Sequence, residues 1–298
     1  MRGGAHGATV PGFHGAMVLV LGATVLGATM LAQAPISNAR VETRTVARGL
    51  EQEVSAVASR PGASWIAYRV AKHAGPERLC CWDNGRCALE DGGSVGINSV
   101  DSGRVMLEPP AELLVFARVE QGRVGKLRMF TPDCSIDAGG MPVVWLEGVD
   151  PTDSVAWLAG LVASTPDSSS WNKPVVNPAL GAIAMHAAPE AVTTLIKMAK
   201  DDASSRVRGQ ALFWLANRAG REAIQAITAA IEDDPDTEVK KKAVFALSQM
   251  PKDDGVPKLI QVARTNRNPA VRKQAMFWLG ESRDPRALQF FEEILLPK

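Results

Sequence analysis

The chain has 298 residues, 46% of them hydrophobic and 22% charged, which is ordinary usage for one or two globular domains with a sizeable core. Its formal net charge is +1. This balance gives no reason to predict binding to nucleic acid or to an anionic membrane surface, since both usually require a clustered excess of basic residues.

Residues 1–39 have the pattern of an export segment. Arg2 is their only charged residue, and Ala16 to Ala32 is an unbroken run of Ala, Gly, Thr, Val, Leu and Met. The sequences Ala32-Gln33-Ala34 and Ser37-Asn38-Ala39 are equally good signal-peptidase sites. An uncleaved membrane anchor is the alternative, because about 17–25 apolar residues can span a bilayer. We therefore predict an exported protein, periplasmic or extracellular, that contacts a membrane only if this segment is retained.

Residues 40–165 are predicted to form a small mixed α/β domain. Apolar residues at a spacing of three to four predict a helix over 45–60, which Pro61-Gly62 ends. Short β-branched and aromatic runs predict strands at 64–70, 112–119, 123–130 and 141–146. The middle two strands form a hairpin, and the alternation of charges in the second arm predicts one solvated face. The Gly- and Ser-rich stretch 91–101 is predicted to be a loop.

All four cysteines, Cys80, Cys81, Cys87 and Cys134, lie within this domain. An even number in an exported chain predicts disulfides, with three possible pairings. A bond between adjacent cysteines would be strained, so Cys80 and Cys81 are expected to take different partners. Zinc and free thiols are the alternatives. The absence of C-x-x-C spacing, and of a histidine between Cys81 and Cys134, argues against zinc. We predict no metal and no cofactor.

Asp150-Pro151 predicts the start of a helix, with Asp as the cap and Pro in the first turn. The polar stretch from Thr165 to Ser170 is the predicted boundary between two halves of the chain.

The region 172–298 contains an internal repeat. Three similar phrases start at Val207, Val239 and Val271, so both intervals are 32 residues, and a degenerate fourth copy begins at Val175. The second half of each copy repeats as well, at Leu195, Ile227, Leu259 and Phe291 and at Ala199, Ile231, Ala263 and Leu295. A fixed period of this size is the signature of a solenoid. We predict a mainly α fold, with a C-terminal α-solenoid of about four helical pairs after the small α/β domain.

The repeat resembles a known family. An Asp/Asn-Pro turn is followed by Val-Arg/Lys, then Ala and Leu four and eight residues after the Val, and the last copy continues with Pro285-Arg-Ala-Leu288. This pattern is similar to short, PBS-lyase-like HEAT repeats, and phrases such as Ala275–Gly280 resemble those of exported bacterial HEAT-repeat proteins. The resemblance is specific over about residues 175–298. It implies an α-solenoid with a protein partner on its surface.

Two groups of enzymes use related repeats, and neither is supported here. Deoxyhypusine hydroxylases bind two irons through His-Glu pairs. Beyond the export segment only His73 and His186 are present, and neither is followed by Glu. For chromophore (phycobilin) lyases, only residues of the repeat core can be matched in this sequence, and no residues of a lyase site can be matched.

Helix geometry identifies a candidate binding surface. At about 100° per residue, the position six residues after the Val points to about 240°, away from the buried Ala and Leu positions. That position holds Phe213, Phe245 and Phe277. We predict that these rings form an exposed apolar ridge that binds the partner. The alternative is burial by neighbouring helices. Trp214 and Trp278 are predicted to pack in the core.

A basic row follows each Val, at Arg208, Lys240 and Arg272. We expect it to form a structural ladder with acids of the preceding loops, Asp201, Asp233 and Asp234.

The sequence contains no catalytic motif. His73, Cys80, Cys81 and Asp83 are the only cluster with a nucleophile and a base, and His186 is expected in the turn before Pro189. We therefore predict an exported, non-catalytic protein-binding scaffold rather than an enzyme. The alternative is an enzyme that uses the cysteine-containing domain, with the solenoid positioning a protein substrate.

Overall fold

The structure is a computed structural model, and it divides the chain into two units, Met1–Gln33 and Ala34–Lys298. It describes residues 36–75, 78–81, 86–90, 95–98, 110–165, 174–218 and 220–296. The predicted export segment up to Pro35, and most of the predicted boundary at 165–170, lie outside these residues.

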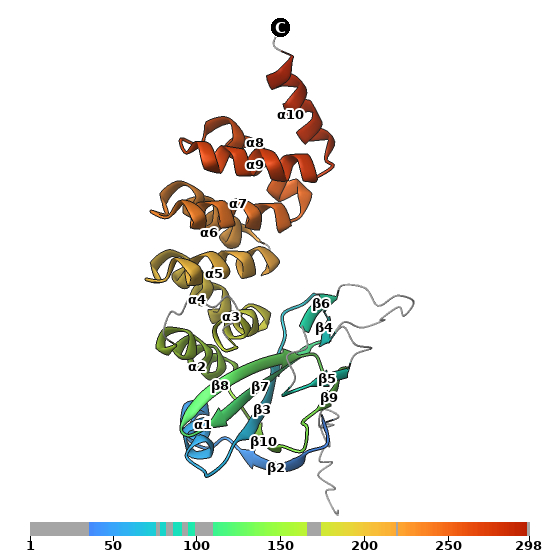
Figure 1. Cartoon of the computed structure of the whole chain (residues 1–298), viewed down its shortest axis with the longest axis vertical. Coiled ribbons are helices and arrows are strands. Elements are labelled where there is room, and N and C mark those ends of the chain that lie inside the picture. The colour runs from blue at the N-terminus through green and yellow to red at the C-terminus, as the bar shows by residue number, and fades with distance from the viewer. Residues whose placement is uncertain are drawn as a thin grey trace, which may run out of the picture. The chain divides into compact units, whose positions relative to one another are not determined.

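A mixed five-stranded sheet occupies the first half of the described chain (Figure 1). Its strands, in order across the sheet, are β2 (Arg40–Thr45), β10 (Pro142–Glu147), β3 (Ser64–Ala71), β7 (Glu112–Glu120) and β8 (Arg123–Phe130). The first three are parallel, and β7 and β8 form the predicted antiparallel hairpin. The interior strands are almost continuously buried, as expected for a sheet that is covered on both faces.

Each face of the sheet packs on a different layer. Alternate residues of β3 separate cleanly: Ile66 and Tyr68 join the core shared with the helices, whereas Trp65 and Ala67 join the core that contains the cysteines. The helical layer consists of α1 (Leu50–Ala58), α2 (Pro151–Ser164) and α3 (Val176–Met185). The cysteine layer contains the short strands β1 (Ile36–Ser37), β4 (Arg78–Cys81), β5 (Arg86–Ala88), β6 (Val95–Asn98) and β9 (Ser135–Asp137).

Three details of the predicted α/β domain were wrong. The first helix starts at Leu50 rather than at Thr45, because residues 40–45 pair with β10 as an edge strand. The second arm of the hairpin is solvated only over Arg123–Lys126 and not along a whole face, because Arg128 is buried against the cysteine layer. The stretch predicted as a loop at 91–101 contains β6, which pairs with β4.

Four helical pairs follow, as the 32-residue period predicts. The first members are α3, α5 (Ser205–Arg218), α7 (Thr237–Gln249) and α9 (Pro269–Glu281), and the second members are α4 (Glu190–Asp201), α6 (Arg221–Asp233), α8 (Lys252–Thr265) and α10 (Pro285–Leu295). Successive first members pack on each other, and Figure 1 shows the pairs as successive layers. The predicted fold class, helical repeats after a small α/β part, is confirmed.

The loops between units repeat the same hydrogen bonds at the same spacing. The side chains of Asp202, Asp234 and Asn266, which are 32 residues apart, each accept a hydrogen bond from the amide two residues later, at 2.8, 2.8 and 3.0 Å. Such local acceptors compete with helix formation and therefore end one helix and turn the chain into the next. Asp236 and Asn268 then cap α7 and α9.

The second halves of the units keep their register in all but the last unit. Leu195, Ile227 and Leu259 are buried, but Phe291 is only half-buried, and Phe290 takes the buried position in α10. Leu295 is likewise exposed, although its counterparts in the earlier units are buried. No described segment packs on the outer side of α10, so its apolar positions lack the cover that a following unit gives elsewhere.

The first unit of the solenoid is joined to the sheet by backbone hydrogen bonds. The His73 amide donates to the Met185 carbonyl and the Ala187 amide donates to the Ala71 carbonyl, each at 2.9 Å. On the other side of α3, the Leu127 amide donates to the Pro174 carbonyl at 2.8 Å. The chain entering and leaving α3 is thus bonded to β8 and to the end of β3.

Side-chain packing closes the same junction around Gly181. A Cβ atom at this position would lie 2.6 Å from Met129 Cε of β8 and 2.7 Å from a ring carbon of Trp214 on α5. Because Gly181 has no side chain, Met129 of the sheet and Trp214 of the second unit can both pack directly on α3.

None of the helices in the described ranges is long and apolar enough to cross a membrane.

We expect Gly181→Ala to lower the free energy of unfolding by about 1–2 kcal/mol, because overpacking at Met129 and Trp214 outweighs the helix propensity of Ala. Gly160→Ala is the matched control, since Gly160 is also helical but has open space around the added Cβ. It should raise the stability by about 0.5–1 kcal/mol. Urea melts measure both, and equal stabilisation by the two substitutions would contradict this account of the junction.

Candidate protein-binding site

An aromatic row crosses three successive units of the solenoid. The Phe213 and Phe245 rings stack at 6.0 Å with an interplanar angle of 4°. The Phe245 ring lies 4.9 Å from that of Trp278, which in turn lies 5.0 Å from the Phe277 ring. These contacts connect α5, α7 and α9 on one face of the stack.

A groove of about 530 Å³ lies along this row. Phe213, Phe245 and Trp278 supply its aromatic surface, and its other lining residues are Gly209, Gln210, Glu238, Lys241, Lys242 and Gln274. The lining thus carries two positive charges and one negative charge. Glu238 is already paired with Lys241, at 3.0 Å.

The three phenylalanines predicted as one ridge have different surroundings. Phe213 and Phe245 are half-buried, because a ring of the next unit lies against each of them. Phe277 is 55% exposed and does not line the groove. Trp278 lines the groove instead, although its position in the repeat predicts packing in the core.

The two tryptophans differ because their partners differ. Trp214 packs on Gly181 of the preceding unit and is buried. Trp278 makes the equivalent contact with Phe245, which is 64 residues after Gly181, and the phenyl ring keeps the indole partly exposed. The different exposure of the two tryptophans could have been predicted from the sequence, because the first unit has Gly at the position that holds Phe in the later units.

A second glycine shapes the floor of the groove. A Cβ atom at Gly209 would collide with the aliphatic part of Lys242, so the lysine side chain lies across α5. Burial lowers the pKa of Lys242, and the nearby charge of Arg206 lowers it further. The amine is therefore held in a partly desolvated position at the groove.

The basic row forms a structural ladder, and of the three predicted acids only Asp234 forms an ion pair with it. Each base donates to a backbone carbonyl at the end of the preceding helix: Arg208 to Asp202 at 2.9 Å, Arg272 to Asn266 at 2.8 Å, and Lys240 to Glu232. The ion pair that Arg208 forms is with Asp234, at 2.8 and 3.0 Å, in the loop after its own unit.

This ion pair links two units at a buried position. Burial alone would raise the pKa of Asp234, but hydrogen bonds from Arg208 and from the Asp236 amide lower it overall. The predicted partners Asp201 and Asp233 do not take part, because the stacking of α5 on α7 brings Arg208 to the following loop instead.

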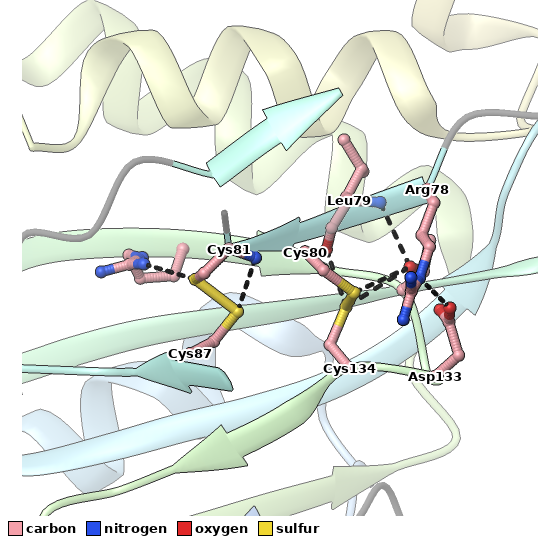
Figure 2. The surroundings of a disulfide bond; sticks show 9 residues. Arg78, Leu79, Cys80, Cys81, Cys87, Asp133 and Cys134 are labelled. Carbon is pink, nitrogen blue, oxygen red and sulfur yellow. Dashed lines mark hydrogen bonds and ion pairs between the residues drawn. A yellow bond between two sulfur atoms is a disulfide. The ribbon is translucent and has the colours of Figure 1, made fainter. Parts of the chain in front are cut away.

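The four cysteines form two disulfides, Cys80–Cys134 and Cys81–Cys87, as Figure 2 shows. The Cα atoms are 5.5 and 5.3 Å apart, within the usual range. This settles the pairing that the sequence left open and confirms that the adjacent cysteines take different partners. Next to the first bond, Arg78 pairs with Asp133.

The predicted cysteine cluster therefore presents no thiolate. Every cysteine is bonded, and a sulfur in a disulfide is neither a nucleophile nor a good metal ligand. Cys80, Asp133 and Cys134 lie close enough together to suggest a metal site, but two of these three atoms are bonded to each other. Asp83 lies outside the described residues.

His186 belongs to a buried hydrogen-bonded chain. It follows the last residue of α3, in the connection before Pro189 as predicted, and it is buried. Its Nδ1 lies 2.6 Å from the Ala182 carbonyl, which can only accept, so Nδ1 carries the ring proton. Its Nε2 lies 2.9 Å from the Ser154 hydroxyl, which also contacts the Tyr68 hydroxyl at 2.8 Å.

The three side chains come from the end of α3, from α2 and from β3, and all of them are fully buried at the junction. Burial lowers the pKa of His186 to about 4 and raises that of Tyr68 above its ordinary value. Both groups stay neutral near pH 7.

Comparison with known proteins supports the repeat assignment. Residues 224–297 match the HEAT-repeat family. The match covers less than half of the chain, and no curated protein matches it.

Two solved structures show distant likeness. The complex of CpcE and CpcF of phycocyanin lyase from Nostoc sp. PCC7120 is 17% identical, with 49% of this chain and 91% of that chain covered and a TM-score of 0.35. Human deoxyhypusine hydroxylase in complex with glycerol is 18% identical, with coverages of 47% and 43% and a TM-score of 0.33. At these TM-scores neither likeness says what this chain does.

The buried His186 should make stability depend on pH. Its pKa of about 4 in the folded chain lies below its ordinary value of 6.5, so the unfolded state binds the proton more readily between these two pH values. Stability conferred by the neutral ring is present above pH 6.5 and is lost as the pH falls towards 4, by roughly 3 kcal/mol.

The measurement is the free energy of unfolding of the wild type and of His186→Asn at several pH values. His186→Asn should be less stable at pH 7 but should lose less stability towards pH 4. His73→Asn, at a half-buried site, should keep the wild-type dependence. Parallel curves for the wild type and His186→Asn would show that His186 does not stay neutral.

Proposed function

We propose that this chain is an exported, non-catalytic module that binds a protein partner in the groove across α5, α7 and α9. The observation that carries the proposal is the groove itself, in which aromatic rings of three units remain partly accessible beside two lysines. Aromatic surface of this kind is enriched at protein interfaces, and solenoids bind partners along surfaces that extend over several units.

The chemistry of the groove favours an acidic segment with an apolar anchor. Lys241 and Lys242 supply the positive charge, and the rings of Phe245 and Trp278 supply the apolar contact. Gln210 and Gln274 line the groove from the two outer helices, and their amides can both donate to and accept from a peptide backbone.

A photo-reactive side chain at Gln210 should cross-link the partner in intact cells, and the purified partner then allows affinities to be measured. We expect Lys241→Glu combined with Gln274→Glu to weaken binding at least tenfold, because both changes add negative charge to a site for an acidic segment.

Lys273→Glu is the matched control. It occupies the same position of the next unit as Lys241 but does not line the groove. The affinity of the Lys273→Glu variant for the partner should stay within about twofold of the wild-type affinity, since charges outside a contact contribute little to binding. An equal loss from the two variants, or no loss from either, would place the partner elsewhere.

Export is part of the proposal and has its own support. The apolar run at Ala16–Ala32 fits a signal peptide, and two disulfides fit an oxidising compartment. Strand β1 begins at Ile36, pairs with β9 and packs in the cysteine layer, so cleavage after Ala34 would preserve it and cleavage after Ala39 would remove it.

Cell fractionation with N-terminal sequencing should therefore find a mature chain outside the cytoplasm that starts at Pro35. An intact N-terminus in the membrane fraction would show that the segment is an anchor. An intact N-terminus in the cytosol would overturn export.

A further inference from the structure

Two departures from the repeat meet on the floor of the groove. Gly209 lies two residues after the Val of its unit, where the next two units both have lysine. Lys242 lies three residues after the Val of the following unit, where the units on either side both have glutamine. A Cβ atom at Gly209 would collide with Cδ of Lys242 and would lie 3.2 Å from its Nζ. The lysine can therefore lie across α5 only because it faces a glycine.

The two lysines of the groove are held in different ways. Lys241 donates to both carboxylate oxygens of the exposed Glu238, at 3.0 Å each. Its charge is already compensated, so a second carboxylate would gain little from it. Lys242 is half-buried against α5, which removes part of its side chain from water. A carboxylate interacts more strongly with such a charge, because the local dielectric constant is lower and folding has already fixed the side chain in place.

The charges that face Lys242 leave a positive edge to the groove. Arg206 of α5 lowers the pKa of Lys242, whereas Asp236 and Glu238, at the start of α7, raise it. Both acids have other contacts, because Asp236 caps α7 by accepting from the Glu238 amide at 2.8 Å and Glu238 is paired with Lys241. An anionic group that binds at Lys242 is also attracted by Arg206.

The lysine and the aromatic row lie about one helical turn apart. Gly209 precedes Phe213 by four residues on α5, and Lys242 precedes Phe245 by three residues on α7. These separations correspond to about 4.5–6 Å along the two helices. A ligand that fills both parts of the groove needs a carboxylate and an apolar side chain at this separation. Side chains three or four residues apart on a helix meet that requirement.

We propose, on the basis of the function proposed above, that Lys242 determines the specificity of the groove. It binds a carboxylate of a helical partner segment, and an apolar side chain three or four residues away in that segment packs on Phe245 and Trp278. The preference for an acid thus belongs to one of two adjacent lysines, and Gly209 acts as a positioning residue for it.

Selection of a displayed random-peptide library on the purified chain tests the proposal. The wild type should enrich peptides that have Asp or Glu three or four residues from a large apolar residue. Lys242→Met keeps the length of the side chain and removes its charge, so it should enrich the apolar residue without the acid. Lys241→Met is the matched control, because it neutralises the adjacent lysine of the same groove, and it should enrich the acid as the wild type does.

A peptide selected on the wild type then allows affinities to be compared. Lys242→Met, or replacement of the peptide's acid by the corresponding amide, should each weaken binding about tenfold. The two changes together should weaken it no further, because both remove the same contact. Gly209→Ala should behave like Lys242→Met, since the added Cβ displaces the lysine from the floor of the groove.

The outcomes separate this proposal from the one on which it rests. An acid that is enriched equally on the wild type and on Lys242→Met would overturn the role of Lys242 and leave binding in the groove intact. Peptides that bind the Lys241→Glu, Gln274→Glu variant as tightly as the wild type would place binding outside the groove and overturn both proposals. A wild type that enriches no peptide would also overturn both.

Discussion

The contact between α3 and the sheet is the constraint on which the rest of the structure depends. A helical pair of a solenoid buries its apolar faces only against its neighbours, so the first pair needs a surface that the repeat cannot supply. Here Met129 of the sheet and Trp214 of the second unit meet over Gly181, and backbone hydrogen bonds fix α3 to two strands. The buried Tyr68–Ser154–His186 chain then sets the orientation of the same elements. The sheet therefore acts as the terminal cap that repeat architectures require.

The replacement of one residue at this cap explains the groove further along the solenoid. Where the first unit has Gly181, the second and third have phenylalanine, and the large side chain keeps the following unit from closing completely over it. Trp214 is consequently buried and Trp278 is partly accessible, although they occupy equivalent positions. The groove is thus a result of imperfect repetition. A stack with identical units would bury every ring to the same extent.

The repeat could be predicted from the sequence because its physical cause is periodic. The spacing of 32 residues locates the helical pairs, and short β-branched runs locate most strands of the sheet. Burial of Arg128 could not be predicted in this way, because it depends on the cysteine layer, which packs on β8 from elsewhere in the chain. The strand at Arg40–Thr45 carries no hydrophobic pattern of its own and is held by β10. The disulfide pairing could be assigned only from the structure, since the sequence allows three connectivities.

The order of the strands has a consequence for how the chain is made. β10 lies between β2 and β3, although it follows them by about a hundred residues and about seventy residues, respectively. The sheet cannot close until this late strand has left the ribosome or the export channel, and α3 has no complete surface to pack on before then. The surface on which the first helical pair packs is therefore complete only once β10 has joined the sheet.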